Sequence, residues 1–127
     1  MVKIFIGVTH KPWFDYLAGI DPVEVNFWQP SGTGTFKALS PGDLFLFKLK
    51  APWNVIAGGG VFEHASLAPL SLAWEAFGKS NGSDSLSGMR AAIATLKHTG
   101  PLTQRDDPTI GCRILTQPFF WESDCWI

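Results

Sequence analysis

The sequence predicts a single α+β domain: a small curved sheet or barrel of about five to six mostly antiparallel strands, flanked by two to three short helices. Short apolar segments with period-two alternation recur along the chain and are separated by turn residues. Too few long helical segments are present for a doubly wound parallel sheet. A chain of 127 residues also fits one domain with a buried core of its own.

The first part of the chain predicts two strands joined by a short helix. Residues 2–8 and residues 23–28 both alternate in the way that strands do, and we expect the first of them to be a buried strand. Pro12 stands at the expected start of the intervening helix, and Gly19 stands just past its end. This order follows the usual preference for proline at helix starts and glycine at helix ends.

A hairpin is expected in the middle of the chain. Residues 40–43 predict a turn, and residues 44–49 form a nearly continuous apolar strand of the kind that is buried on both faces. A loop at residues 51–54 then returns the chain into an antiparallel strand over residues 55–63. The glycines at 58–60 would weaken a strand, so they indicate a bulge, a barrel corner or a close approach of backbone.

Two helices and a last strand are expected in the second half. Residues 71–77 predict a short helix, and Asp84 is placed to cap a second helix that stops at Gly100. Residues 110–115 have the pattern of a final strand. The second helix is amphipathic, with an apolar face formed by Leu86, Met89, Ile93 and Leu96.

Charge and aromatic content narrow the possible functions. The formal net charge of −1 weighs against a function that needs many phosphate contacts, because Lys and Arg supply most non-specific affinity for nucleic acid. A protein that holds one base in a pocket needs few such contacts. The chain has six Trp and ten Phe against one Tyr. Indole rings suit stacking on bases, although most aromatic side chains fill cores.

The sequence contains no recognisable catalytic or cofactor motif. His10, His64 and His98 lie on different expected elements without metal-ligand spacing, so no metal site is expected. The segment at residues 78–80 lacks the earlier glycine that a phosphate-binding loop requires. We therefore assign no catalytic residue and expect no cofactor.

We expect a cytoplasmic protein. The first seven residues lack the features of a signal peptide, and no apolar run reaches membrane-spanning length. Cys112 and Cys125 have no metal-type spacing, and both are expected to be reduced thiols in the core.

Several stretches of the sequence carry a family resemblance: residues 24–32, 41–49, 58–62, 72–78, 81–82, 109–112, 117–120 and 126–127. They resemble the N-terminal domain of predicted HNH-family restriction endonucleases, and they cover nearly the whole chain. The resemblance implies a sensor domain, with an HNH nuclease domain further along the full-length protein. It implies double-stranded DNA as the partner, no membrane, and room for a homodimer formed through the region that this sequence lacks.

A wider similarity concerns the expected hairpin. From Gly42 to Glu63 the chain has a Gly-Asp step, an apolar strand, a loop, and a glycine-containing apolar strand that ends at an acid. This pattern is similar to the central hairpin of the EVE, YTH and ASCH branches of the PUA superfamily. The segment at residues 26–29 is similar to the Asn-aromatic-Gln segment that lines the base pocket of EVE domains, with one additional aromatic residue. The similarity implies a PUA-like pseudo-barrel whose aromatic pocket accepts one base flipped from duplex DNA, with a modified cytosine such as 5-methylcytosine as the expected base.

The residue types of this segment suit such a pocket. A flipped base needs stacking surfaces and partners for its Watson–Crick edge. Trp28 and Phe27 are candidates for the surface, and Trp13 is a candidate for a further wall or for the core. Strand alternation places Asn26 and Trp28 on one face and Phe27 on the other, so Trp28 is favoured as the stacking residue. The candidates for reading the base edge are Asn26, Gln29 and Ser31.

Further candidates for DNA contact lie outside this segment: Trp53, Lys48, Lys50, Arg105 and Arg113. Trp53 belongs to the expected hairpin loop, where it would be exposed and free to enter a groove. The four basic residues are candidates for phosphate contacts, although scattered surface charges are individually often inert.

Two other functions stay open. ASCH relatives include proposed ribonucleases, and in such an enzyme His10, Lys11 and Lys37 would be the first residues to suspect. A domain that binds a protein or a metabolite is the third hypothesis, and the acidic net charge favours it. Turnover of a substrate distinguishes the enzyme from both binding modules, and modification-dependent binding distinguishes the two binding modules from each other.

Overall fold

The computed structural model describes residues 3–31, 36–97, 99–100, 102–103 and 105–127. The elements are β1 (Ile4–Thr9), α1 (Lys11–Ile20), β2 (Glu24–Asn26), β3 (Leu44–Leu49), β4 (Ile56–Pro69), α2 (Leu70–Phe77), the 3-10 helix η1 (Gly78–Asn81), α3 (Leu86–Leu96), β5 (Thr109–Phe120) and the 3-10 helix η2 (Ser123–Cys125). The predicted α+β class is confirmed.

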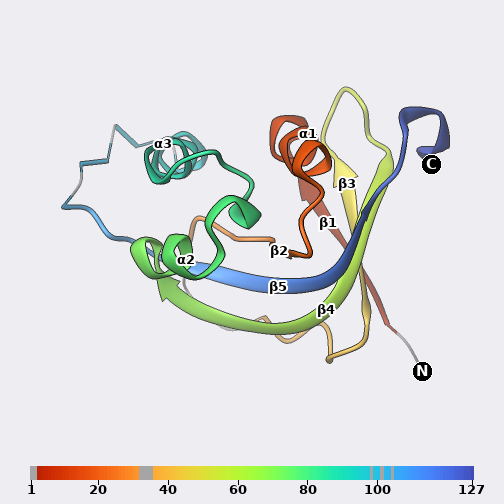
Figure 1. Ribbon diagram of the computed structural model, residues 1–127, viewed down its shortest axis with the longest axis horizontal. Coiled ribbons are helices and arrows are strands. Elements are labelled where there is room, and N and C mark those ends of the chain that lie inside the picture. The colour runs from red at the N-terminus through yellow and green to blue at the C-terminus, as the bar shows by residue number, and fades with distance from the viewer. Residues whose placement is uncertain (1–2, 32–35, 98, 101, 104) are drawn as a thin grey trace.

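The strands form one five-stranded sheet in the order β1-β3-β4-β5-β2. β1 runs parallel to β3, and the other three pairings are antiparallel, as the sequence predicts for most of the sheet. Figure 1 shows β4 and β5 as long strands that curve together, with α1 and α3 on the inner side of the curve. Within the described residues β1 and β2 do not pair with each other, so the sheet is curved but open.

The predicted hairpin is confirmed, and β4 continues beyond it to Pro69. Its glycines allow neighbouring backbones to approach closely. A side chain on Gly58 would overlap the carbonyl oxygen of Phe119, and one on Gly59 would overlap the carbonyl oxygen of Phe45. The pairing of β4 with β5 also shifts register between Gly59 and Val61. The glycines therefore mark both a close approach and an irregularity, two of the three expected explanations.

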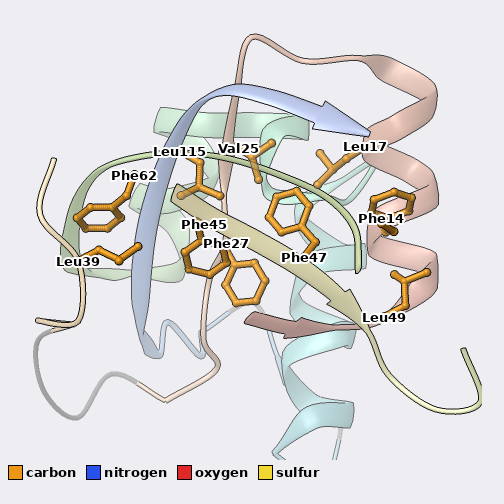
Figure 2. Packing of buried hydrophobic residues seen from close by; sticks show 11 residues of the cluster. Phe14, Leu17, Val25, Phe27, Leu39, Phe45, Phe47, Leu49, Phe62 and Leu115 are labelled. Atoms are coloured by element: carbon orange, nitrogen blue, oxygen red, sulfur yellow. The ribbon is translucent and has the colours of Figure 1, made fainter. Parts of the chain in front are cut away.

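Two clusters of buried apolar residues hold the fold together. The first cluster lies between α1 and the sheet and is rich in phenylalanine (Figure 2); Phe14 of α1 packs edge-on against Phe47 of β3 at a centroid distance of 6.5 Å. The second cluster joins α2, α3 and the N-terminal half of β5. Its members are Leu70, Ala73, Met89, Ile93, Ile110, Cys112 and Ile114. The predicted apolar face of α3 thus packs onto the sheet through Met89 and Ile93.

The expectation that the first strand is buried is wrong, because β1 is an edge strand. Ile4, Ile6 and Val8 are 60%, 50% and 56% exposed. The opposite face of β1 turns inward, and Gly7 leaves room there for the ring of Phe45: a β-carbon at position 7 would lie 2.6 Å from that ring. The aromatic rings of the first cluster thus pack against the inner face of β1, where Gly7 has no side chain.

Several smaller expectations are also corrected. Ser85, not Asp84, caps α3, because its hydroxyl accepts a hydrogen bond from the backbone N–H of Gly88 at 3.0 Å. Cys112 is buried, but Cys125 is exposed in the last 3-10 helix. The C-terminal ends of α1 and α3 also differ from those that the sequence predicts.

Helix α1 continues past Gly19 to Ile20 and ends at Asp21, whose φ is +48°. Helix α3 ends at Leu96, four residues before Gly100. No helix in the described part of the chain is long and apolar enough to cross a membrane.

Candidate functional site

A pocket of about 650 Å³ lies where the end of β1, helix α1 and helix α3 meet the segment that follows β2. This volume is in the range of small-molecule binding sites. Its aromatic lining consists of Trp13, Tyr16, Phe27 and Trp28. Its polar lining includes Thr9, His10, Gln29, Ser83, Asp84 and Ser85, and Ala92 and Leu96 add apolar surface from α3. We call it the first pocket.

Both tryptophans of the first pocket are fixed by the same atom. The main-chain carbonyl oxygen of Asn81 accepts a hydrogen bond from Nε1 of Trp13 at 3.0 Å and another from Nε1 of Trp28 at 2.8 Å. The two indole N–H groups, which are their only polar atoms, are therefore used within the protein. What the rings present to the pocket is apolar aromatic surface.

The side chain of Asn81 is buried and holds that carbonyl in place. Its Oδ1 accepts from Nδ2 of Asn26 at 2.9 Å, and its Nδ2 donates to the carbonyl oxygens of Ala73 at 3.1 Å and Gly78 at 2.8 Å. The Oδ1 of Asn26 in turn accepts from the backbone N–H of Arg113 at 3.1 Å. Such a satisfied buried network specifies one arrangement, because each group left without its partner would carry a desolvation penalty.

Phe27 forms the floor of the first pocket and belongs to the first core cluster. The ring of Trp13 meets Phe27 edge-on at a centroid distance of 5.4 Å and Phe47 edge-on at 5.3 Å. Edge-to-face contacts are the preferred geometry of aromatic pairs. The pocket wall is therefore continuous with the core and is held rigidly.

Polar groups gather at the rim. The carboxylate of Asp84 accepts a long hydrogen bond of 3.4 Å from the hydroxyl of Tyr16 and lies 3.7 Å from the ammonium of Lys79. Burial lowers the pKa of His10 below its ordinary value, and the nearby charge of Lys50 lowers it further. The His10 imidazole is consequently neutral at pH 7, with one nitrogen able to donate and the other to accept.

The structure brings four of the six predicted pocket residues together: Trp13, Phe27, Trp28 and Gln29 all line the first pocket. The predicted alternation is also found, since Asn26 and Trp28 both reach Asn81 while Phe27 enters the first core cluster. Asn26 itself is fully buried behind the pocket, and its amide is occupied by Asn81 and Arg113. It is a positioning residue and cannot read a base edge in this arrangement.

Ser31 lies in a different place, on a second pocket of about 540 Å³. This second pocket has Phe5, Phe36, Lys37 and Arg113 among its lining residues, and it shares Gln29 and Pro30 with the first pocket. The segment of residues 29–30 thus separates two adjacent cavities.

The five predicted DNA-contact residues come from four segments. Trp53 is 43% exposed in the loop after β3, with the ammonium of Lys11 5.5 Å from its ring centre. Lys48 is half-buried on β3, and Lys50 is exposed near His10. Arg105 is exposed in the loop before β5, and Arg113 is half-buried on β5 in the second pocket.

The structure does not bring the three residues suspected in the ribonuclease hypothesis into one cavity. His10 lines the first pocket, Lys37 lines the second, and the ammonium of Lys11 pairs with Asp15 at 2.6 Å. His98 falls outside the described residues. Across the described ranges, no group of three or more His, Cys, Asp or Glu side chains is arranged to hold a metal ion.

Asn81 and Gly82 organise the first pocket, although the sequence analysis gave them no role in it. An Asn-Gly dipeptide is a turn signal, and that signal was visible. The partners of Asn81, however, lie 68, 55 and 53 residues away along the chain, at Trp13, Asn26 and Trp28. Local periodicity carries no information about such distant contacts.

No protein-family model matches this sequence, and no curated protein shows significant similarity to it.

Proposed function

We propose that this chain is a reader of a modified base in duplex DNA, with a PUA-like fold, and that it targets an HNH restriction endonuclease. The base, a modified cytosine, flips out of the duplex into the first pocket. The observation that carries the proposal is the shared hydrogen-bond acceptor of Trp13 and Trp28 on Asn81, which turns two indoles into preoriented apolar surfaces.

The free energy of stacking on such surfaces is comparable to the cost of extruding a base. Extruding a base from duplex DNA costs a few kcal/mol. Stacking on an aromatic side chain contributes about 1 to 3 kcal/mol per base, so contacts with Trp13, Trp28 and the Phe27 floor can offset the extrusion. The rings are ordered before the ligand arrives, which lowers the entropy lost on binding.

The rim supplies groups that suit cytosine. A carboxylate accepts from the exocyclic amino group of cytosine, and Asp84 lies at the rim. Gln29 and neutral His10 each offer a donor and an acceptor to the Watson–Crick edge. A methyl group on C5 finds apolar surface on Ala92 and Leu96. The described lining of the pocket includes no Lys or Arg, so its chemistry suits a base better than a phosphate.

Binding of short labelled duplexes tests this proposal. They carry cytosine, 5-methylcytosine or 5-hydroxymethylcytosine at one position, and fluorescence anisotropy is measured at fixed salt. We expect one modified duplex to bind about fourfold or more tightly than the unmodified one, because burying one methyl group contributes about 0.8 kcal/mol. Trp28→Ala should weaken that binding about tenfold, as loss of one stacking contact predicts.

Trp53→Ala is the matched control, because Trp53 is an exposed tryptophan outside both pockets. It should leave the preference for the modified duplex unchanged. Thermal unfolding of both variants confirms that the domain is intact, and Gln29→Ala repeats the test without removing a ring. Equal binding of the wild-type protein to all three duplexes contradicts this choice of bases, and cleavage of RNA by the wild type would support the ribonuclease instead.

A further inference from the structure

The second pocket contains a half-buried cation on an aromatic support. The guanidinium of Arg113 lies 4.2 Å from the ring centre of Phe36 and 5.9 Å from that of Phe5. Arginine keeps its charge in proteins, so this group is a desolvated cation rather than a neutral one. A guanidinium stacked on a ring keeps its in-plane N–H groups free for a ligand.

No carboxylate neutralises this cation. All eleven acidic residues of the chain belong to the described part, and none has an oxygen within 4.0 Å of the Arg113 guanidinium. Lys37 adds a second positive charge to the lining of the pocket, which includes no described Asp or Glu. A desolvated charge without a partner is unfavourable, so the site is complementary to an anion.

Hydrogen bonds connect residues of the second pocket to those that fix the aromatic wall of the first. Two hydrogen bonds of the Arg113 main chain tie it to the segment that carries the aromatic wall. Its carbonyl accepts from the N–H of Phe27 at 2.9 Å, and its N–H donates to the side-chain Oδ1 of Asn26 at 3.1 Å. Asn26 also holds Asn81, the residue that fixes both tryptophans. Gln29 and Pro30 line both cavities.

We propose that the second pocket binds a backbone phosphate of the same DNA strand whose flipped base occupies the first pocket. The two cavities divide a nucleotide by its chemistry: the aromatic cavity takes the base, and the cavity with Arg113 and Lys37 takes the phosphodiester through charge-assisted N–H···O bonds. This assignment rests on the proposed base-reading function and adds the position of the backbone to it.

The test combines a protein variant with a change in the DNA. Duplexes with one modified cytosine carry either ordinary phosphodiesters or a single uncharged methylphosphonate, placed in turn on each side of that cytosine. We expect Arg113→Gln to weaken binding of the ordinary duplex about tenfold and to reduce the salt dependence by about one counterion. One methylphosphonate position should weaken wild-type binding by a similar factor and should not weaken binding of Arg113→Gln further.

Arg90→Gln is the matched control, because it removes another half-buried arginine that lines neither pocket; it should change affinity less than about twofold. If Arg113→Gln does not fold, Lys37→Gln and the methylphosphonate series on the wild-type protein decide the question. Fully additive losses, or no loss with any methylphosphonate, would overturn the phosphate site. Inorganic phosphate that displaces the duplex at low millimolar concentration would also overturn it and would assign the pocket to a small free anion.

The two proposals fail in different ways. Loss of coupling between Arg113 and the methylphosphonate, with discrimination between modified and unmodified cytosine retained, removes the phosphate site alone. Retained coupling without any discrimination removes the base-reading function and leaves a phosphate-binding site on the protein.

Discussion

Gly82 leaves open the space that the indole of Trp13 fills. At a backbone φ of +88°, a β-carbon on residue 82 would overlap the Cδ1 and Nε1 atoms of that ring. The same indole donates to the carbonyl of Asn81, one residue earlier. Position 82 therefore has two independent reasons to be glycine: the left-handed backbone and the close approach of the ring that walls the first pocket.

Gly82→Ala should lower the free energy of unfolding by about 2–4 kcal/mol, because it adds strain of the left-handed conformation to overlap with a packed ring. Chemical denaturation measures this loss. Gly19→Ala serves as the control, since nothing lies within 4 Å of a β-carbon at that helical position, and it should raise stability slightly. Equal stability of Gly82→Ala and the wild type would show that the ring of Trp13 does not occupy this space.

Much of the fold follows from local patterns. The hairpin of β3 and β4 was predictable because two apolar runs flank the turn residues at 51–54, and the N–H of Leu49 closes that loop by donating to the carbonyl of Val55 at 2.9 Å. Which face of β1 is buried was not predictable, since Ile4 and Ile6 on the exposed face are as apolar as Phe5 on the other face. Which face turns inward depends on where Phe45 places its ring, and that is a property of another strand.

In the candidate site, too, some features follow from local sequence patterns and others do not. Alternation along residues 26–28 correctly separates Trp28 from Phe27, because neighbouring side chains of an extended chain point to opposite faces. Ser31 follows only five residues after Asn26, yet it lines the other cavity. The distinction depends on the path of the chain after β2 ends, and no periodic signal describes that path.

Asn26→Asp tests the buried amide network with almost no change in shape. The Nδ2 of Asn26 donates to Oδ1 of Asn81, so a carboxylate at position 26 would place two acceptors against each other. We expect a loss of about 3–5 kcal/mol at pH 7, because an uncompensated charge is left buried. Urea denaturation measures it, with the exposed Asn54→Asp as control.

The pH dependence of Asn26→Asp has a defined sign. Burial raises the pKa of a carboxyl group, so the folded variant binds a proton that the unfolded chain has already released. Its stability should therefore increase as the pH falls from 7 toward 5, since a protonated carboxyl can again donate to Asn81. A penalty independent of pH would indicate that water reaches this position.

Asp43 is predicted to stabilise the fold only in its ionised form. The backbone N–H of Ser40 donates to its Oδ2 at 2.8 Å, and that of Lys3 donates to Oδ1 at 3.2 Å. These bonds, the one from Ser40 foremost, lower the pKa of Asp43 below the ordinary 3.8, against a smaller opposing effect of burial. A lowered pKa gives stability that is present above pH 3.8 and is lost as the pH falls through the folded-state pKa.

Asp43→Asn should therefore be less stable than the wild type at pH 7, and the difference should shrink below pH 4. Thermal unfolding across this range measures the effect, and Asp124→Asn, an exposed substitution in η2, is the control. A difference that stays constant down to pH 2 would mean that the charge of Asp43 has no part in the stability.

His10 and Lys50 provide the last test, at the rim of the first pocket. Burial first and the charge of Lys50 second lower the pKa of His10 below 6.5. Lys50→Met should raise that pKa toward 6.5 without reaching it, because burial stays. The backbone N–H of Lys50, which donates to the carbonyl of Thr9 at 3.0 Å, is unaffected by the substitution.

The sign of the linked stability follows from the same shift. As the pH falls through 6.5, the unfolded chain binds a proton on His10 before the folded protein does, so His10 lowers the free energy of unfolding in this range. Lys50→Met should reduce that loss, and NMR titration of the imidazole gives the pKa directly. Lys48→Met, two residues earlier near the end of β3, is the control, and an equal shift in both variants would show that the field at His10 is not that of Lys50. A shift specific to Lys50→Met would show that the charge of Lys50 adds to the effect of burial in keeping the pKa of His10 below 6.5.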